Sequence, residues 1–407
     1  MSACQKNILT RSFFLSAILF ESTLLDRAVA TIQPCPPVSD STAHDRESPE
    51  DVALHPRLFF PKLCSLIDRA RSSSAAVEAN LAEELASSPL SSTYRSPDFA
   101  EFPATNMLRT SRRAAENGPS VRDPDPIPIV MAHGLGDSCF NRGLQKLANL
   151  TSSQTGRATW CVPQGDTRNR DVIASFLVSM DDTVDAFAEQ VRSDPRTADG
   201  FDAIGFSQGC NIVRGYIAKY NDPPVRTFMS VNGVNAGVAA LPNCSPRGPG
   251  KIGSACEAIA EATGSLAYNK FVQSFLFPAN YYRDPELLES HGYRKYSQIA
   301  RWSNEGYANN GTLNENFART DKFVWVLATR DTVVFPREGE HWGALDPDAE
   351  DPFTAKALDM KSTSWYENDS FGLRAADEAG KFHFESFPGN HLGFSTEDYA
   401  RWIDAYF

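Results

Sequence analysis

One motif in the sequence bears directly on chemistry: a serine held between two glycines. The stretch GFSQG runs from Gly205 to Gly209 with Ser207 at its centre, after a short apolar run and before an amphipathic stretch. At such a turn between a strand and a helix, G-x-S-x-G forms a sharp elbow that lifts the serine hydroxyl onto a helix N-terminus. Glycines are required where neighbouring elements leave no room for a Cβ. We therefore interpret Ser207 as a nucleophile, with a structural turn serine as the alternative.

The nucleophile needs a base, because a serine hydroxyl is nearly unreactive at neutral pH. With this elbow the chain order is serine, then acid, then histidine, and four of the seven histidines come late enough to consider. His291 precedes the best acid candidate, and His341 follows that acid too closely to come from a separate loop. His383 lies within the alternating strand pattern KFHFESF. His391, in the loop GNH after the last predicted strand, is the predicted base.

The base in turn needs a carboxylate to orient it. Asp331 ends the apolar run KFVWVLATRD, which places it at the carboxyl edge of the predicted sheet, where such folds build their sites. We expect it to hold the imidazole in the correct tautomer and to stabilise the imidazolium that forms. Four other aspartates are alternatives, but none follows the end of a predicted strand. We interpret them as solvated charges in loops: Asp346, Asp348, Asp351 and Asp369.

A tetrahedral oxyanion requires two preset N–H donors, each worth about 3 kcal/mol in other hydrolases. We predict the backbone N–H of Gln208, directly after the nucleophile, as one donor. The N–H of Leu135, in the loop MAHGLGDSC after the first predicted strand, is the other. His133 in the same loop precedes the nucleophile, so a loop-ordering role is favoured for it over that of a base.

The elements that must position these residues begin at Ile127. Between the first two strands lies DVIASFLVSMDDTVDAFAEQVRSD, whose apolar residues recur every three or four positions, as on one face of a helix. Strands that are apolar throughout, separated by amphipathic helices, indicate a mostly parallel sheet with helices on both faces. The fold class is therefore α/β. The predicted strands are IPIVMAHG, FDAIGFS, RTFMSVNG, KFVWVLATRD and KFHFESFPGNH.

The catalytic part of the chain has one long interruption, between the nucleophile and the acid. It covers about residues 241–319, is locally helical and is rich in aromatic residues. Such an insertion can be a lid or a ligand-binding subdomain, or it can simply extend the core. Cys244 and Cys256 lie close together at its start, and we expect them to form a disulfide.

The N-terminal third differs in composition from the rest. Residues 1–30 carry Lys6 and Arg11, then the apolar run SFFLSAILF and the small residues Ala28-Val29-Ala30, the pattern of a cleaved secretory signal. Residues 31–125 are rich in Ser, Ala, Pro and charge, which indicates a low-complexity or disordered segment. Two short helices are possible within it, around residues 61–70 and 75–86. The catalytic domain is predicted at 126–407.

The net charge and the cysteine content limit which partners and which cellular compartment we expect. The net charge of −12 excludes nucleic acid as a partner, because binding by counterion release needs a basic surface. No segment is long and apolar enough to be a transmembrane helix. Seven of the eight cysteines follow the signal, so at least one must stay unpaired within the chain. Three credible glycosylation sequons agree with secretory passage, at Asn149, Asn310 and Asn368.

Together these motifs resemble the lysosomal palmitoyl-protein thioesterases. The resemblance runs from about Pro126 to Phe407 and implies an α/β-hydrolase fold. By match it assigns catalysis to Ser207, Asp331 and His391, and it implies no cofactor and no metal. The matching stretches are HGLGDSC, GFSQG, VNGVNAGVAALPNC, YYRDP, DTVVFP, YENDSFGL and GNH.

The chain also departs from the family pattern. Phe140 stands where a second cysteine usually follows the one matching Cys139, and Ala188 and Tyr220 lie near the places of a further family disulfide. Asn390 replaces the aspartate usual before the histidine. These departures put the disulfide pattern and acid stability in question more than the triad.

The resemblance implies a substrate class, a fatty acyl thioester on a protein cysteine. A cysteine thiolate, with a reference pKa near 8.5, leaves with little protonation, and an apolar groove gains about 0.8 kcal/mol per buried CH₂ of the acyl chain. S-acylated proteins, and possible substrates such as fatty acyl-CoA, are the expected partners, in the lysosome or outside the cell. An oxygen-ester lipase with the same triad and an inactive lipid-binding homologue are the alternatives. Candidate groove walls in the insertion are Phe271, Phe275, Leu276 and Phe277.

Overall fold

A six-stranded sheet forms the centre of the molecule. The computed structural model describes residues 61–71, 75–87, 126–240 and 267–407. The strand order is β2-β1-β3-β4-β5-β6, and all five pairings are parallel, as predicted. The strands are β1 (Ile129–Ala132), β2 (Thr159–Cys161), β3 (Phe201–Phe206), β4 (Val225–Val231), β5 (Lys322–Ala328) and β6 (Phe382–Phe387).

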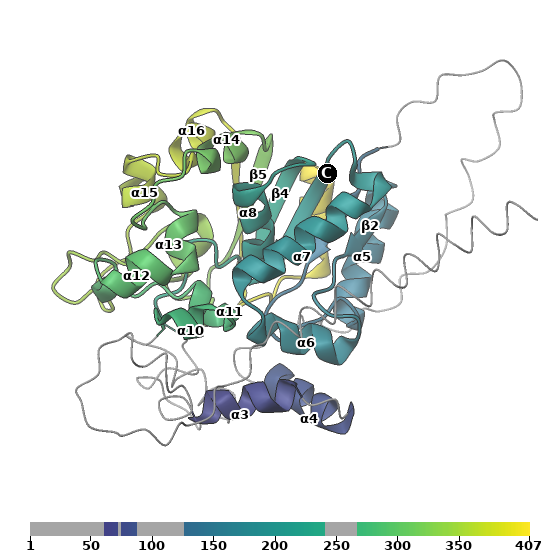
Figure 1. Ribbon diagram of the computed structural model, residues 1–407. Coiled ribbons are helices and arrows are strands. Elements are labelled where there is room, and N and C mark those ends of the chain that lie inside the picture. The colour runs from purple at the N-terminus through teal and green to yellow at the C-terminus, as the bar shows by residue number, and fades with distance from the viewer. Residues whose placement is uncertain (1–60, 72–74, 88–125, 241–266) are drawn as a thin grey trace, which may run out of the picture.

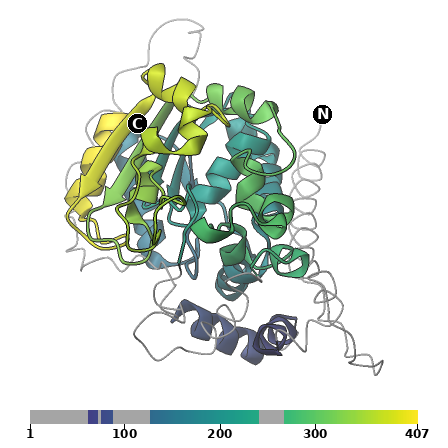
Figure 2. The same cartoon turned by 90° about the vertical axis from the view of Figure 1, so that its left-hand side faces the viewer.

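Helices cover both faces of this sheet, so the strands are buried on both sides (Figures 1 and 2). Residues along each strand alternate between two apolar cores. In β1, for example, Val130 belongs to the core beneath α6 (Arg168–Leu177), α7 (Met180–Ser193) and α8 (Gly209–Lys219). Its neighbour Met131 belongs to the core beneath α5 (Arg142–Thr155) and α17 (Thr396–Tyr406). Two-sided burial explains why the strands are apolar throughout. The predicted fold class, an α/β-hydrolase fold, is confirmed.

The strand ends are nearly level along the carboxyl edge of the sheet. Phe206 at the end of β3 pairs with Val231 at the end of β4, and Ala328 at the end of β5 pairs with Phe387 at the end of β6. Because parallel strands share one carboxyl edge, the residues that follow these strands converge on one side of the molecule.

Two details of the predicted elements differ from the structure. The strand β2 is only three residues long, too short to stand out in the sequence. The stretch predicted as one helix is two helices, α6 and α7, separated at Val178 and Ser179. The Ser179 hydroxyl accepts a hydrogen bond from the N–H of Asp182 and so caps the start of α7.

The part of the insertion that the structure describes, residues 267–319, is made of short helices, as predicted. The expected disulfide between Cys244 and Cys256 lies outside the described residues. Further helices follow β5. The helices of both regions are α10 (Lys270–Gln273), α11 (Phe277–Asn280), α12 (His291–Tyr296), α13 (Gln298–Trp302), α14 (Thr312–Ala318), α15 (Ser364–Glu367) and α16 (Leu373–Glu378).

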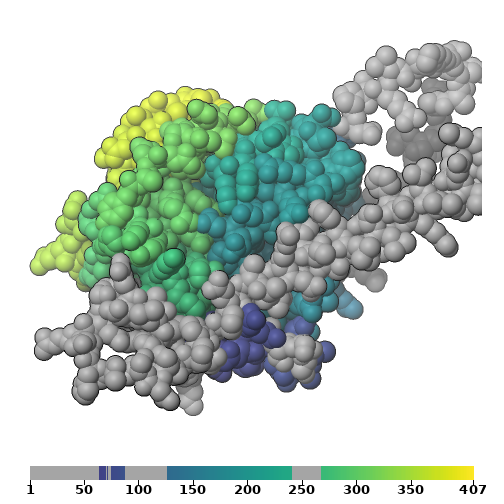
Figure 3. Space-filling view, viewed as in Figure 1, coloured from purple at the N-terminus to yellow at the C-terminus, as the bar shows by residue number. Residues whose placement is uncertain are grey.

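The two short helices expected in the N-terminal segment are present as α3 (Pro61–Ala70) and α4 (Ala75–Ala86). They lie beside the domain, with α4 against α6 (Figures 1 and 3). Leu81 and Leu85 of α4 are buried, and Glu78 forms an ion pair with Arg170 of α6 at 3.5 Å. This part of the predicted low-complexity segment is therefore ordered and packed. The predicted signal at residues 1–30 lies outside the described residues.

Across the described ranges, no helix combines the length and the apolar character that a membrane crossing requires.

Candidate active site

Ser207 stands on a strained turn between β3 and α8, as the motif predicts. Its φ is +52°, in the left-handed region that few non-glycine residues adopt. A Cβ on Gly205 would lie 2.6 Å from Cα of Cys210, and one on Gly209 would lie 2.2 Å from the carbonyl oxygen of Ala132. Both distances are below any normal contact, so only glycine allows α8 to approach β1 and β3 this closely.

The structure brings the three predicted triad residues into contact. His391 Nε2 lies 2.8 Å from Ser207 Oγ, and His391 Nδ1 lies 2.6 Å from Asp331 Oδ2. Asp331 follows β5 and His391 follows β6, so both come from the carboxyl edge that also carries the elbow. A hydroxyl, an imidazole and a carboxylate in this order can move a proton from the serine to the histidine.

Asp331 is held firmly by the turn in which it lies. Its Oδ1 accepts hydrogen bonds from the backbone N–H groups of Val333 at 2.7 Å and Val334 at 2.8 Å. Burial is the largest influence on its pKa and raises it. The nearby His391 outweighs burial through charge and hydrogen bonding, helped by Glu340, so that the pKa of Asp331 falls to about 2. The carboxylate is therefore ionised across the physiological range and can accept the His391 N–H.

Asn390 joins the loops of the acid and the base. Its Oδ1 accepts hydrogen bonds from the backbone N–H of Thr332 at 2.9 Å and from that of His391 at 2.7 Å. Thr332 directly follows Asp331, so one side chain links the loops of the candidate acid and the candidate base. A neutral asparagine can hold this position, although the family pattern has an aspartate here.

The residues rejected as base or acid have other partners. His341 Nε2 lies 3.0 Å from the carbonyl oxygens of Trp325 and Glu385, and burial lowers its pKa. The ring of His383 lies beside that of Tyr406, with centroids 5.3 Å apart. Three of the rival aspartates accept hydrogen bonds from nearby backbone N–H groups in their own loops: Asp346, Asp351 and Asp369.

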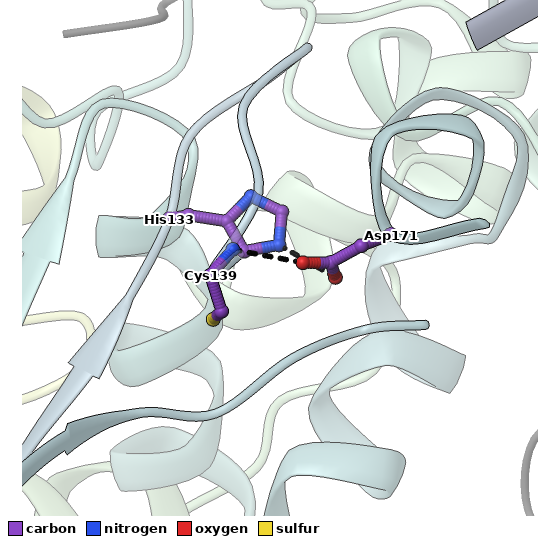
Figure 4. A group of neighbouring side chains, drawn as sticks. All are labelled: His133, Cys139 and Asp171. Atoms are coloured by element: carbon purple, nitrogen blue, oxygen red, sulfur yellow. Dashed lines mark hydrogen bonds and ion pairs between the residues drawn. The ribbon is translucent and has the colours of Figure 1, made fainter. Parts of the chain in front are cut away.

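The loop after β1, which contains the predicted oxyanion donor Leu135, is tied down by a buried carboxylate, Asp171 of α6 (Figure 4). Asp171 Oδ1 accepts from His133 Nε2 at 2.9 Å, and Oδ2 accepts from the Ser138 hydroxyl and the Cys139 N–H, each at 2.9 Å. The backbone N–H groups of residues 164 and 165 also donate to Oδ1. Five donors therefore converge on one side chain that sequence reasoning did not single out.

His133 has the loop-ordering role expected of it. Its second nitrogen, Nδ1, lies 3.0 Å from the carbonyl oxygen of Gly134, so both ring nitrogens face acceptors. Burial, the largest influence, lowers the pKa of His133, but the charge and hydrogen bond of Asp171, with Asp137, raise it to about 9. At neutral pH this residue is a cation within a buried ion pair and has no lone pair to act as a base.

Helix α6 also connects the two predicted oxyanion donors. The Ser175 hydroxyl accepts from the N–H of Gly136 at 2.9 Å, next to Leu135. The carbonyl of Ser175 accepts from Nε2 of Gln208 at 2.7 Å. One residue of α6 thus holds both the loop after β1 and the residue after the nucleophile.

A disulfide that sequence reasoning did not predict also braces this loop. Cys139 is bonded to Cys161 at the end of β2, with Cα atoms 5.4 Å apart. Phe140, at the place of the missing family cysteine, is exposed. Cys210, which follows the elbow, is a free and buried thiol, and burial raises its pKa to about 12. It is therefore no rival to Ser207 as a nucleophile.

Within the described residues, two groups of side chains have the composition of a metal site, but their members have other partners. His133, Cys139 and Asp171 lie within ligand distance of one another, yet Cys139 is in a disulfide and both nitrogens of His133 are hydrogen bonded. The second group is Asp331 and His391 of the triad with the nearby Glu340.

The candidate acyl-groove residues lie in and around α10 and α11, and α11 contacts α6. Phe275, Leu276 and Phe277 are almost fully buried in the core that includes α6 and α8, whereas Phe271 is half-buried. The rings of Phe271 and Phe275 meet edge to face at 4.9 Å. Their role in binding an acyl chain stays a prediction.

With the site described, the chain can be compared with known proteins. The profile of the family described as "Palmitoyl protein thioesterase" matches residues 128–391, from the start of β1 to the candidate base. The chain belongs to this family. It is 29% identical over 270 residues to Palmitoyl-protein thioesterase 1 of Caenorhabditis elegans, covering 65% of this chain and 86% of that protein.

The chain is also similar to other relatives and to solved structures. Lysosomal thioesterase PPT2-B of Xenopus laevis is 27% identical over 192 residues, covering 47% of this chain and 62% of that protein. A carboxyl esterase from the fungus Tuber melanosporum is 12% identical with a TM-score of 0.34, over 69% of this chain and 76% of the esterase.

Proposed function

We propose that this protein is a thioesterase that removes long-chain fatty acyl groups from cysteines of S-acylated proteins, through an acyl-enzyme on Ser207. The contact geometry of Ser207, His391 and Asp331, at 2.8 and 2.6 Å, is the observation that carries the proposal. Membership of the family supports the choice of a thioester over other acyl substrates.

Acylation begins when His391 Nε2 accepts the hydroxyl proton of Ser207 as the serine oxygen attacks the thioester carbonyl carbon. The imidazolium that forms donates its Nδ1–H to Asp331, whose low pKa keeps it ionised. The tetrahedral intermediate places a negative charge on the former carbonyl oxygen, which we assign to the N–H groups of Leu135 and Gln208. Their loops are both bonded to Ser175 of α6, a support fixed before the charge appears.

The intermediate collapses with cleavage of the carbon–sulfur bond, and the cysteine sulfur leaves with the proton from His391. Water then attacks the acyl-serine while His391 accepts its proton. The second intermediate collapses with cleavage of the bond to Ser207 Oγ, which regains the proton from His391 as the fatty acid leaves. Phe271 is the best placed of the four candidate groove residues to contact the acyl chain, because it is half-buried whereas the others are enclosed in the core.

We also propose that the protein enters the secretory pathway and acts in the lysosome or outside the cell. The Cys139–Cys161 disulfide supports an oxidising compartment. The sequon residues Asn149, Asn310 and Asn368 are all exposed, as a glycan requires. The Xenopus laevis relative is named as a lysosomal thioesterase. A shift in electrophoretic mobility after enzymatic removal of N-glycans from the secreted protein tests this placement.

The catalytic proposal is tested by comparing wild type with Ser207→Ala on three substrates: palmitoyl-CoA, an S-palmitoyl peptide and a triglyceride. We expect the wild type to hydrolyse the thioesters and the variant to lose at least roughly a thousandfold in kcat/KM. Undiminished turnover by the variant contradicts the nucleophile assignment. A preference for the triglyceride identifies an oxygen-ester lipase instead. Failure of a fluorophosphonate probe to label Ser207 indicates an inactive lipid-binding homologue.

A further inference from the structure

We propose that Glu340 is a positioning residue of the active site, which acts as a neutral carboxylic acid and donates a hydrogen bond to the carboxylate of Asp331. This inference rests on the proposed function, because it deepens the account of the same triad. Neither the GFSQG motif nor the strand pattern points to Glu340, which lies in a short 3₁₀ turn, η5 (Arg337–His341), nine residues after Asp331.

The side chain of Glu340 is fully buried, and its two oxygens have unlike surroundings. Oε2 accepts two hydrogen bonds of 2.8 Å, from Asn232 Nδ2 and from the backbone N–H of Ala328. Oε1 is enclosed and has no donor among the described residues. One carboxylate oxygen of Glu340, one of Asp331 and a ring nitrogen of His391 lie within 4.8 Å of one another. Because Oε2 already has two donors, we take the unpartnered Oε1 as the oxygen that faces Asp331.

Two neighbouring buried carboxyl groups resist being ionised together, because their like charges repel and burial removes much of their solvation. The hydrogen bonds decide which of them keeps the proton. Asp331 accepts from two backbone N–H groups and from the His391 ring, all of which favour its charged form. A proton on Glu340 Oε1 completes the set, since it turns the unpartnered oxygen into a donor to Asp331.

The electrostatic setting agrees with this assignment. Burial first, then the hydrogen bond and charge of Asp331, raise the pKa of Glu340 well above its ordinary value. The titratable groups that face Glu340 are Asp331, His391 and the buried thiol of Cys210. Asp331 is the one anion among these three groups, and a proton on Glu340 removes the repulsion between the two carboxyl groups.

Glu340 is also linked to the loop of the base through Asn232, the residue after β4. Asn232 donates from Nδ2 to Glu340, and its Oδ1 accepts from the backbone N–H of Leu392 at 2.9 Å. Leu392 directly follows His391. Glu340 therefore lies beside the acid and is linked to the loop of the base through one amide, and it can keep the two aligned while the proton moves.

A purely structural acid at this position would only accept the two hydrogen bonds on Oε2. Glu340→Gln separates a neutral acid from an ionised one, because a glutamine can accept on its oxygen and donate from its NH₂ group, as the neutral acid does. We expect this variant to keep kcat within about threefold of wild type and to leave the pH profile of kcat/KM in place.

Glu340→Ala removes both the donor and the acceptor and is the contrasting variant. We expect kcat to fall at least roughly thirtyfold, with KM changed less than about threefold. We also expect the acidic limb of the profile to move to higher pH, because an Asp331 carboxylate without its donor attracts the imidazolium proton more strongly. Glu338→Gln is the matched control: its side chain is 44% exposed, two residues away, and it should behave as wild type.

Each outcome decides the question. If Glu340→Gln loses as much activity as Glu340→Ala, or moves the acidic limb by a full unit, Glu340 is not a neutral donor. If both variants retain full activity, it does not position the triad. Should Glu340→Ala fail to fold, the glutamine variant still decides by its pH profile.

The rate at which a fluorophosphonate probe labels Ser207 tests the role of Glu340 independently of the proposed thioester substrate. Labelling needs an activated serine but no thioester, so a wild type that labels without hydrolysing palmitoyl-CoA contradicts only the proposed function. The ratio of labelling rates among the Glu340 variants then tests the positioning role. Equal rates in wild type and Glu340→Ala would overturn it.

Discussion

Two histidine–aspartate pairs of nearly the same geometry lie in the part of the chain that the structure describes, and we assign acid–base chemistry to only one of them. His391 lies 2.6 Å from Asp331, and His133 lies 2.9 Å from Asp171. Both pairs lie close to the carboxyl edge of the sheet. The type of residue and the distance between the partners therefore do not distinguish a catalytic pair from a structural one.

The second nitrogen of each ring makes the difference. In His391 it faces the hydroxyl of Ser207, a group that can give up its proton. In His133 it faces the carbonyl oxygen of Gly134, which can only accept. The His133 ring is therefore held as a cation that fastens a loop, while the His391 ring can pick up and return a proton.

Asp331→Asn tests the catalytic pair and should have the largest effect. The backbone N–H groups of Val333 and Val334 hold the oxygen Oδ1, so the new NH₂ group takes the place of Oδ2 beside His391. It would then donate to Nδ1 and force the proton onto Nε2, which could no longer accept the Ser207 proton. We expect kcat to fall roughly 1,000- to 10,000-fold in steady-state assays on palmitoyl-CoA.

Asp348→Asn, an exposed loop substitution, is the control and should leave kcat unchanged. A fall of less than about tenfold in Asp331→Asn, with the fold intact by circular dichroism, would mean that another carboxylate orients the base.

Asp171→Asn tests the structural pair, and its main effect should be on stability. Either orientation of the amide sets its NH₂ group against a backbone N–H, that of Cys139 on one side or those of residues 164 and 165 on the other. It also leaves the buried cation of His133 without its counter-ion. Removing one member of a buried pair costs about 3 to 5 kcal/mol. We expect the melting temperature to fall by roughly 10 °C.

The same Asp348→Asn protein serves for comparison, since a surface aspartate should not alter the melting temperature by more than about 1 °C. An unchanged melting temperature in Asp171→Asn would show that the five hydrogen bonds on this carboxylate contribute little to stability.

The triad could be selected from sequence because each member has a local signal. Ser207 lies in a motif whose two glycines are required, because a Cβ on either would lie only 2.6 or 2.2 Å from a neighbouring atom. Asp331 follows an apolar run that is indeed β5. His391 remained after the alternatives were removed by their place in the chain. Parallel strands then carry all three to one edge, so order along the chain is enough to bring them together.

The supporting residues have no such signal. Asp171 lies in the first turn of α6, where an acidic residue is ordinary. Its function depends on donors from the distant loop after β1 and on the backbone of residues 164 and 165, just before α6. Glu340 is one of several acidic residues in a loop, and only burial sets it apart. Asn232 could have been noticed, because it is a polar residue directly after an apolar strand, as Asp331 nearly is. The Cys139–Cys161 pairing depends on β2, which was too short to predict.

The structural pair should also make stability depend on pH, with a smaller effect. The pKa of His133 is about 9 in the folded protein, against 6.5 as the ordinary value in an unfolded chain. A group with a raised folded pKa stabilises fully below its unfolded pKa, and the contribution is lost as pH rises through the folded value. His133 should therefore stabilise the fold below pH 6.5 and cease to do so above about 9, a loss of at most about 3 kcal/mol.

The measurement is urea unfolding of wild type and His133→Gln between pH 6 and 9.5. Subtracting the variant removes the titration of other groups, and a glutamine can still donate one hydrogen bond to Asp171 without a charge. We expect the difference in free energy of unfolding to be largest at pH 6 and to shrink towards pH 9.5. A constant difference would mean that His133 is neutral when folded, and the contrast between the two pairs would then lie in the partner of the second ring nitrogen and not in charge.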